Sequence, residues 1–287
     1  MLVIIGVVVV IVSVFGGYLM EGGKIHVLFQ PVELLIIGGA ALGSLLISAP
    51  VTLIKKIISQ AIGTIAGHSA SRDEYTQVLL CLYEIFKIGK ANPLALEPIA
   101  ENPKDNEIFK RYPFVLHDPH MVDFICDTLK MQVSSPMTPF DLEELLDTDI
   151  ATVHHDDAQA PATVTRIGDA MPGLGIVAAV LGVVITMGKL TQGKEVIGHS
   201  VAAALVGTFL GILASYGFMQ PLAAKMEANL EGHTKMYNVI KVALIALARE
   251  APPKVCVEFA RRSIPMHLRP SFKEIDSQTS SAGKKAA

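Results

Sequence analysis

Four long stretches of the chain are almost free of charged side chains, and polar sequence separates them. A helix that crosses a bilayer needs about 20 mainly apolar residues, whereas apolar runs of 10–14 residues are typical of buried core helices. Each of the four stretches reaches the bilayer length, so the pattern favours membrane spans over buried core helices. The predicted transmembrane helices are residues 1–20, 32–54, 169–189 and 200–224.

The spans form two hairpins with short connections at residues 21–31 and 190–199. Most of the 24 Lys and Arg residues lie in the two large segments, 55–168 and 225–287. Basic residues near span ends mark the cytoplasmic side. The large segments are therefore predicted to be cytoplasmic, and the short connections are predicted to be periplasmic loops.

Within residues 55–168, apolar side chains recur at the spacing of one helix face. One such set is Val78, Leu79, Leu82, Ile85 and Phe86. After the fourth span, an amphipathic pattern predicts a helical extension and a tail, and Pro252-Pro253 is expected to stop this helix. The predicted fold is all-α, a polytopic membrane protein with four transmembrane helices and a helical cytoplasmic domain.

Composition supports a membrane protein and removes several other classes. The 287 residues are 51% hydrophobic and 18% charged, with a formal charge of −3. A nucleic-acid-binding protein would be expected to carry a basic surface. No P-loop, G-x-G-x-x-G or G-x-S-x-G motif occurs in the sequence, so we expect no enzyme and no cofactor. The cluster His154-His155-Asp156-Asp157 has no second cluster with metal-ligand spacing, and a metal site is disfavoured.

Small residues are concentrated in the spans. Gly39 and Gly43 form one G-x-x-x-G pair, and Gly207 and Gly211 form another. Such pairs let helices approach closely, and generic helix packing explains most of them. The density of small residues in the last two spans instead suggests a tight seam or a polar pathway. The hydroxyl groups expected along it belong to Thr186, Thr208, Ser215 and Tyr216.

Ionisable residues are missing from the centres of the spans. Proton relays need such a group at depth. Glu33 and Asp169 lie near span ends and are interpreted as interfacial residues. If the protein conducts protons, the titrating carboxylate is expected to come from another polypeptide. Pro172 and Pro221 lie inside or at the ends of spans, where proline acts either as a static kink or as a hinge.

Several sequence motifs are similar to those of the MotA family of flagellar motor stator proteins, and the resemblance covers about residues 1–275. The most specific motifs are Gly168-Asp169-Ala170-Met171-Pro172-Gly173-Leu174-Gly175 and Val206-Gly207-Thr208-Phe209-Leu210-Gly211. Further matching motifs are Gln30-Pro31-Val32-Glu33-Leu34, Glu101-Asn102-Pro103, Ala251-Pro252-Pro253 and Arg269-Pro270-Ser271-Phe272.

The resemblance implies a subunit of the bacterial inner membrane that forms a ring of five around two copies of a MotB-like, peptidoglycan-anchored partner. That partner would bring the membrane-embedded Asp, and proton flow would drive torque on FliG of the rotor C-ring. By position, Lys90 and Glu97 resemble the rotor-facing charged pair. Without the resemblance, the charges around them read as a solvated surface or as a surface that steers a partner.

The resemblance also implies roles for other residues in the spans. Pro172 and Pro221 resemble the two functional prolines of the family, and Thr208 resembles the hydroxyl residue of its ion path. The sequence departs from the family where Lys90 replaces the usual Arg, which keeps the charge but loses the planar fork. Sodium-type relatives carry Thr where this chain has Ala179. Since Ala cannot coordinate a dehydrated ion, the proton is the expected coupling ion.

Two alternatives have sequence signatures of their own. An ExbB-like energiser of outer-membrane transport shares the plan of a ring around a partner, but it is usually built with three spans. A substrate transporter predicts inverted repeats and a polar site at the midplane. The four spans and the C-terminal motif favour the motor protein over the ExbB-like energiser, and the sequence shows neither feature of the transporter.

Overall fold

The computed structural model describes residues 2–67, 70–189, 191 and 193–285. These residues form helices, turns and loops, and the described part of the chain contains no strand. They divide into two compact units. One comprises residues 1–69 and 155–230, and the other comprises residues 70–154 and 231–287. The two long helical segments of the C-terminal half contribute residues to both units.

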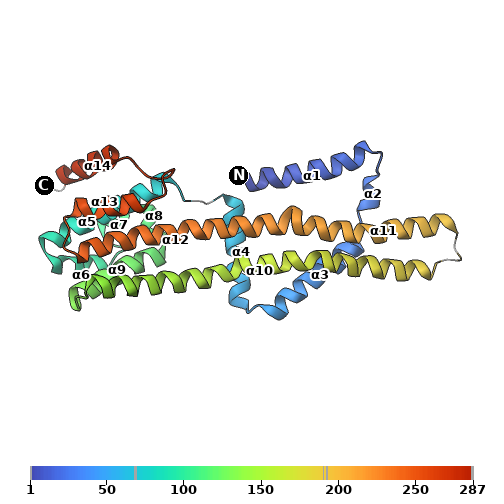
Figure 1. Ribbon diagram of the computed structural model, residues 1–287, viewed down its shortest axis with the longest axis horizontal. Helices are drawn as coiled ribbons and strands as arrows, with labels where there is room; N and C mark the ends of the chain where they lie inside the picture. The colour runs from blue at the N-terminus through green and yellow to red at the C-terminus, as the bar shows by residue number, and fades with distance from the viewer. Residues whose placement is uncertain (1, 68–69, 190, 192, 286–287) are drawn as a thin grey trace. The chain divides into compact units, whose positions relative to one another are not determined.

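Four helical segments of the described chain are long and apolar enough to cross a membrane, which confirms the predicted all-α, four-span fold. They are Leu2–Met20, Ile25–Ser48, Pro139–Met187 and Val196–Ala248. In Figure 1 these segments carry the labels α1 (Leu2–Met20), α2 (Ile25–Leu28) with α3 (Pro31–Ser48), α10 (Pro139–Met187), and α11 (Lys194–Ile212) with α12 (Gln220–Ala248).

The second apolar helix ends earlier in the chain than the sequence pattern predicts. Helix α3 ends at Ser48, and a separate helix, α4 (Val51–Ala66), follows. Ala49 and Pro50 between them have extended backbones. Proline disfavours helical geometry in the residue before it, so Pro50 divides an apolar run that hydropathy alone treats as one span.

The third and fourth spans continue far beyond the apolar stretches. Helix α10 starts at Pro139, within the predicted segment 55–168, and runs unbroken to Met187. A change from polar to apolar side chains leaves the backbone hydrogen bonds of a helix intact. The predicted boundary at 168/169 therefore lies inside a helix, although the side chains change character there.

In the unit of residues 1–69 and 155–230, α4 packs against α10 and α12 through a small apolar cluster. Its buried members are Ala49, Leu53, Ile57, Ala160, Val164, Ala223 and Met226. Polar contacts extend this packing. Lys56 pairs with Asp157 at 2.8 Å, and the Gln60 Nε2 donates to the Asp157 carbonyl at 3.4 Å. Pro161, buried within α10, has no N–H for that carbonyl, and the Gln60 side chain supplies a donor in its place.

The other unit contains a larger apolar core. Its helices are α5 (Arg72–Ala91), η1 (Pro93–Ala95), α6 (Leu96–Glu101), α7 (Glu107–Arg111), α8 (Pro113–Leu116), α9 (Pro119–Ser134), α13 (Pro253–Ser263) and α14 (Phe272–Lys285), with parts of α10 and α12. Tyr75, Phe86 and Phe109 are among its largest fully buried side chains. Ser71 forms a capping box with Glu74 at the start of α5. The helix predicted around Val78–Phe86 lies within α5, and its predicted face is buried.

The long C-terminal helix ends before the proline pair. Helix α12 ends at Ala248, and Glu250 adopts the left-handed conformation with φ 57°. The Ala251 N–H then donates to the Ala246 carbonyl at 3.1 Å, which closes the helix end. Pro253 starts α13 instead of stopping α12.

Candidate functional site

Helices α10 and α11 meet along a seam of very close backbone contacts, and Figure 1 shows them side by side. A Cβ added to Gly175 would lie 2.8 Å from the Gly207 carbonyl oxygen. A Cβ added to Gly211 would lie 2.6 Å from the Met171 carbonyl oxygen and 2.9 Å from the Gly175 Cα. Glycine is therefore required at these positions for the two backbones to approach this closely.

The two G-x-x-x-G pairs of the sequence differ in the structure. Gly207 and Gly211 pack against α10 within the chain, whereas Cβ atoms added to Gly39 and Gly43 would meet nothing within 4 Å. Of the two pairs, only the one in α11 contributes to this intrachain seam.

The structure brings Ala179 and Thr208 to this seam. The Ala179 backbone nitrogen lies 3.3 Å from a Cβ added to Gly207, and the Thr208 Cα lies 3.3 Å from a Cβ added to Gly175. Both residues are half-buried. The two sequence-predicted ion-path residues thus lie on facing helices, one turn apart along the seam, and Thr208 brings a hydroxyl group.

Glu33 also lies at the seam, although it is near the end of its span. It is 7% exposed, and its Oε2 lies 3.0 Å from a Cβ added to Gly207. That oxygen has no hydrogen-bond partner among the described residues. The buried residues of α3 are Glu33, Ile37 and Ala41, spaced four apart on one helix face. That spacing is a sequence signal that would have placed Glu33 on the packed side.

The other hydroxyl groups expected along the seam divide into three cases. Thr186 is buried and donates to the Gly182 carbonyl at 2.8 Å, so its own helix satisfies it. Tyr216 is 66% exposed, which contradicts a place inside the seam. Ser215 is fully buried, and its Oγ has no hydrogen-bond partner among the described residues.

The two predicted functional prolines occupy different local structures. Pro172 lies inside α10 and is half-buried. Pro221 is exposed and is the second residue of α12, directly after η3, a π-helix over Leu213–Met219. A side-chain hydrogen bond joins the neighbourhoods of the two prolines, because the Gln220 Nε2 donates to the Asp169 Oδ1 at 2.6 Å. The sequence pattern contains no signal for the π-helix.

Lys90 and Glu97 lie near one corner of the unit of residues 70–154 and 231–287, and both side chains are exposed. Lys90 is in the last turn of α5 and Glu97 is in the first turn of α6, where each charge suits the helix dipole. Leu96 packs on Gly89, and its Cδ1 would lie 2.7 Å from a Cβ added to Gly89. This contact holds the end of α5 against the start of α6. The Lys90 Nζ donates to the Glu250 carbonyl at 3.0 Å, and the described residues show no ion pair between Lys90 and Glu97.

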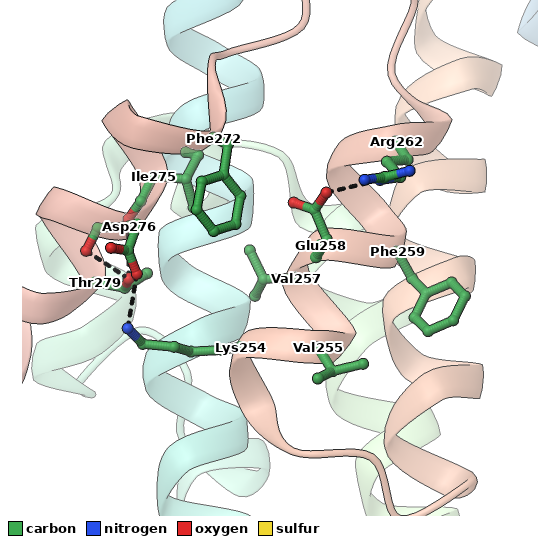
Figure 2. A pocket seen from close by; sticks show the side chains of 10 residues that line it. All are labelled: Lys254, Val255, Val257, Glu258, Phe259, Arg262, Phe272, Ile275, Asp276 and Thr279. Atoms are coloured by element: carbon green, nitrogen blue, oxygen red, sulfur yellow. Dashed lines mark hydrogen bonds and ion pairs between the residues drawn. The ribbon is translucent and has the colours of Figure 1, made fainter.

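A groove of about 440 Å³ lies over α13 and α14 in the same unit, away from every sequence-predicted site residue. Figure 2 shows the Lys254–Asp276 pair, at 2.7 Å, on one side and Glu258 with Arg262 on the other. Hydrogen bonds from Arg261 and Arg262 lower the pKa of Glu258 to about 2. The Lys254–Asp276 pair joins α13 to α14, whereas the Glu258–Arg262 pair lies within α13.

Comparison with known proteins assigns the class. Residues 4–93 match the model of the motility protein A N-terminal domain, and residues 119–239 match the MotA/TolQ/ExbB proton channel family. The chain is thus a channel-type membrane protein built from helices. It is 38% identical over 278 residues to motility protein A of Salmonella typhimurium, covering 96% of this chain and 94% of that protein. It is 33% identical to the chemotaxis protein LafT of Vibrio parahaemolyticus, covering 95% and 96%.

Solved structures show the same fold. The chain aligns with the structure of C. jejuni MotAB with a TM-score of 0.76 and 20% identity, covering 94% of this chain and 98% of that one. The flagellar MotAB stator complex from Bacillus subtilis aligns with a TM-score of 0.71 and 20% identity, covering 92% and 94%. The chain belongs to the motility protein A family. This confirms the resemblance found in the sequence, and it favours the stator protein over the ExbB-like alternative.

Proposed function

We propose that this chain is the ion-conducting stator subunit of a bacterial flagellar motor. Together with a MotB-like partner in the inner membrane, it converts proton flow into torque on FliG of the rotor. The observation that carries the proposal is the α10–α11 seam, where Ala179 and Thr208 lie on facing helices next to the buried Glu33. The likeness to motility protein A over almost the whole chain supports the same function.

The seam suggests an incomplete ion path. Glu33 lies in the first turn of α3, near one end of its span, and the described residues of the spans contain no buried carboxylate nearer the centre. A proton relay needs a titrating group at depth. The partner would supply that group as a membrane-embedded Asp, and five copies of this chain would surround two copies of the partner. Helix α1 has no buried residue, which leaves its surface available to neighbouring subunits and lipid.

The residues at the seam favour the proton as coupling ion. Ala179 offers no side-chain oxygen, and Thr208 offers a single hydroxyl group. A dehydrated sodium ion requires several oxygen ligands, whereas a proton needs only a titrating group and a relay. Rotation speed is therefore expected to follow the proton gradient. A speed that follows external sodium and ignores a protonophore would overturn the choice of ion.

One elementary charge that crosses 100 mV supplies about 2.3 kcal/mol. Repeated transits are therefore needed for useful work, and Pro172 and Pro221 are proposed to couple them to movement. Pro172→Ala is expected to reduce torque while the complex still assembles. Wild-type torque in this variant would contradict a role of Pro172 in coupling ion transit to movement.

Lys90 and Glu97 are proposed to form the contact with the rotor. Both are exposed, and the corner that carries them is fixed by the packing of Leu96 on Gly89. Exposed charges steer partners and set register. Glu97→Lys is therefore expected to impair swimming without lowering the amount of protein in the membrane. Lys110→Glu, an exposed charge reversal on α7, is the matched control and should swim normally.

The decisive experiment is complementation. Deletion of the gene for this chain should abolish swimming, and the wild-type chain should restore it only when the MotB-like partner is present. Restored swimming without that partner would contradict the proposed complex. Swimming that is unaffected by the deletion, in a cell with no second stator, would contradict the function.

A further inference from the structure

The turns around Pro172 and Pro221 are tied together by one pair of side chains. Gln220 directly precedes Pro221, and its Nε2 donates to the Oδ1 of Asp169, three residues before Pro172, at 2.6 Å. The helices approach closely beside this bond, because a Cβ added to Gly168 would lie 3.3 Å from the Gln220 Nε2 and 3.3 Å from the Met219 Cβ. The bond therefore lies at the point where α10 meets the start of α12.

Gln220 also ends the π-helical turn. Its backbone N–H donates to the Ser215 carbonyl, five residues earlier, and the next residue, Pro221, has no N–H to continue the ladder. π-helices make up well under 1% of residues in proteins, and they occur frequently at functional sites. One residue thus holds η3 through its backbone and α10 through its side chain.

The π-helical turn leaves a polar group unsatisfied. The Ser215 Oγ is fully buried without a partner among the described residues. Several buried threonine hydroxyls in the α-helical parts of this chain donate to the carbonyl four residues earlier, as Thr186 does to Gly182 at 2.8 Å and Thr163 does to Gln159 at 2.7 Å. An α-helical turn would offer Ser215 the same bond. The π form therefore carries a local cost that the α form lacks, which narrows the free-energy difference between the two forms.

We propose that Asp169 and Gln220 are a positioning pair that holds the π form of η3. The pair passes movement of the Pro172 turn to the start of α12 at Pro221. This inference rests on the proposed stator function and assigns the coupling within it to a specific contact. Thr208 lies on α11, directly before η3 in the same continuous helical segment, so a change at the seam reaches η3 along the helix.

Helix geometry explains how a change in η3 would move α12. One residue of helical register corresponds to a rotation of about 100° and a rise of about 1.5 Å. A change between the π and α forms of η3 would therefore turn α12 about its own axis relative to α11. Two packed arrangements of similar free energy, selected by one contact, are a common basis of conformational coupling.

The test uses the full-length chain, produced with its own partner in cells that lack the chromosomal copy. The alanine variants are Gln220→Ala and Asp169→Ala. The conservative variant Asp169→Asn keeps an oxygen acceptor for the Gln220 Nε2, whereas Gln220→Asn keeps the amide and loses reach. Torque per stator unit is measured from the speed steps of tethered cells, and membrane abundance is measured by immunoblot.

Each alanine variant is expected to lower torque per stator unit about fivefold, the factor in an equilibrium that corresponds to one ordinary hydrogen bond. The double alanine variant should be no worse than either single one, since both remove the same bond. Asp169→Asn should retain wild-type torque, and Gln220→Asn should behave like Gln220→Ala. Abundance should be unchanged throughout.

Three results would overturn the inference: wild-type torque in the alanine variants, additive losses in the double variant, or an Asp169→Asn variant as weak as Asp169→Ala. Torque that falls only in proportion to abundance would indicate a purely structural role and would also overturn it. The wild-type chain in the same cells separates the two proposals. If the wild-type chain restores swimming while the variants of Asp169 and Gln220 give one of these contradicting results, the positioning pair is refuted and the stator function is not.

Discussion

Gly211→Ala is expected to separate the two helices of the seam. The new Cβ would lie 2.6 Å from the Met171 carbonyl oxygen, 2.9 Å from the Gly175 Cα and 3.1 Å from the Gly175 nitrogen. Ordinary van der Waals contact begins at 3.4 Å. All three neighbours are backbone atoms, so no side chain can rotate away, and α10 and α11 must move apart by several tenths of an ångström.

The cost follows from the packing. Overpacking a well-packed interior costs about 1–3 kcal/mol, and the rigid backbone neighbours place Gly211→Ala near the upper end of this range. Alanine also favours a helix over glycine by up to about 1 kcal/mol, which offsets part of that cost. The expected net loss is about 2 kcal/mol, or a factor of about 30 in the folding equilibrium.

Gly39→Ala is the matched control, because it adds the same methyl group to a span glycine with nothing within 4 Å in the chain. The thermal midpoint of the purified, detergent-solubilised complex is measured for both variants and the wild type. Gly211→Ala should lower the midpoint by several degrees, and Gly39→Ala should leave it unchanged or raise it. Equal midpoints for Gly211→Ala and wild type would refute the close approach of the two backbones. A drop of equal size in both variants would show that Gly39 is packed in the assembled complex.

Three further predictions concern stability. Glu250→Gly should raise the thermal midpoint, because glycine adopts the left-handed conformation (φ 57°) without the roughly 1–2 kcal/mol cost of a side chain; a lower midpoint would show that the Glu250 side chain has a role of its own. The pKa of Glu258, held at about 2 by its arginine partners, means that this carboxylate stabilises the fold above its ordinary pKa and that the contribution is lost as pH falls toward 2. Glu258→Gln should remove this part of the acid dependence in a pH series of unfolding midpoints, and an unchanged series would count against the ion pairs. Gln60→Ala should cost about 1 kcal/mol of stability, since the Asp157 carbonyl next to Pro161 loses its donor, and an unchanged midpoint would mean that the long 3.4 Å bond contributes nothing.

Much of the fold could be predicted because its signals are local. Length and apolarity identify four spans, and the 3.6-residue periodicity identifies α5 with the correct buried face. Boundaries were less predictable. A hydropathy profile does not reveal the extended backbone at Pro50, where the helix ends. It also does not reveal that α10, which begins at Pro139, continues without a break where its side chains change from polar to apolar. Backbone geometry, and not side-chain polarity, decides where a helix ends.

Among the candidate site residues, motif resemblance identified Ala179, Thr208, Pro172 and Pro221, and the structure places the first two on facing helices. For Glu33 the sequence indicates only a position near a span end, and the structure adds that α3 turns its side chain toward Gly207. The roles of Lys90 and Glu97 remain predictions, since contacts within one chain do not reveal which partner an exposed charge meets.

The sequence by itself determined the class of the protein, the number of its spans and the positions of its amphipathic helices, because hydrophobicity and helical periodicity act over neighbouring residues. Tertiary structure decided which of the two G-x-x-x-G pairs packs within the chain, where the Glu33 carboxylate is buried, and that Gln220 reaches Asp169. These features depend on the register between helices that are distant in sequence. That register is a property of the packed faces together, and no single segment contains it.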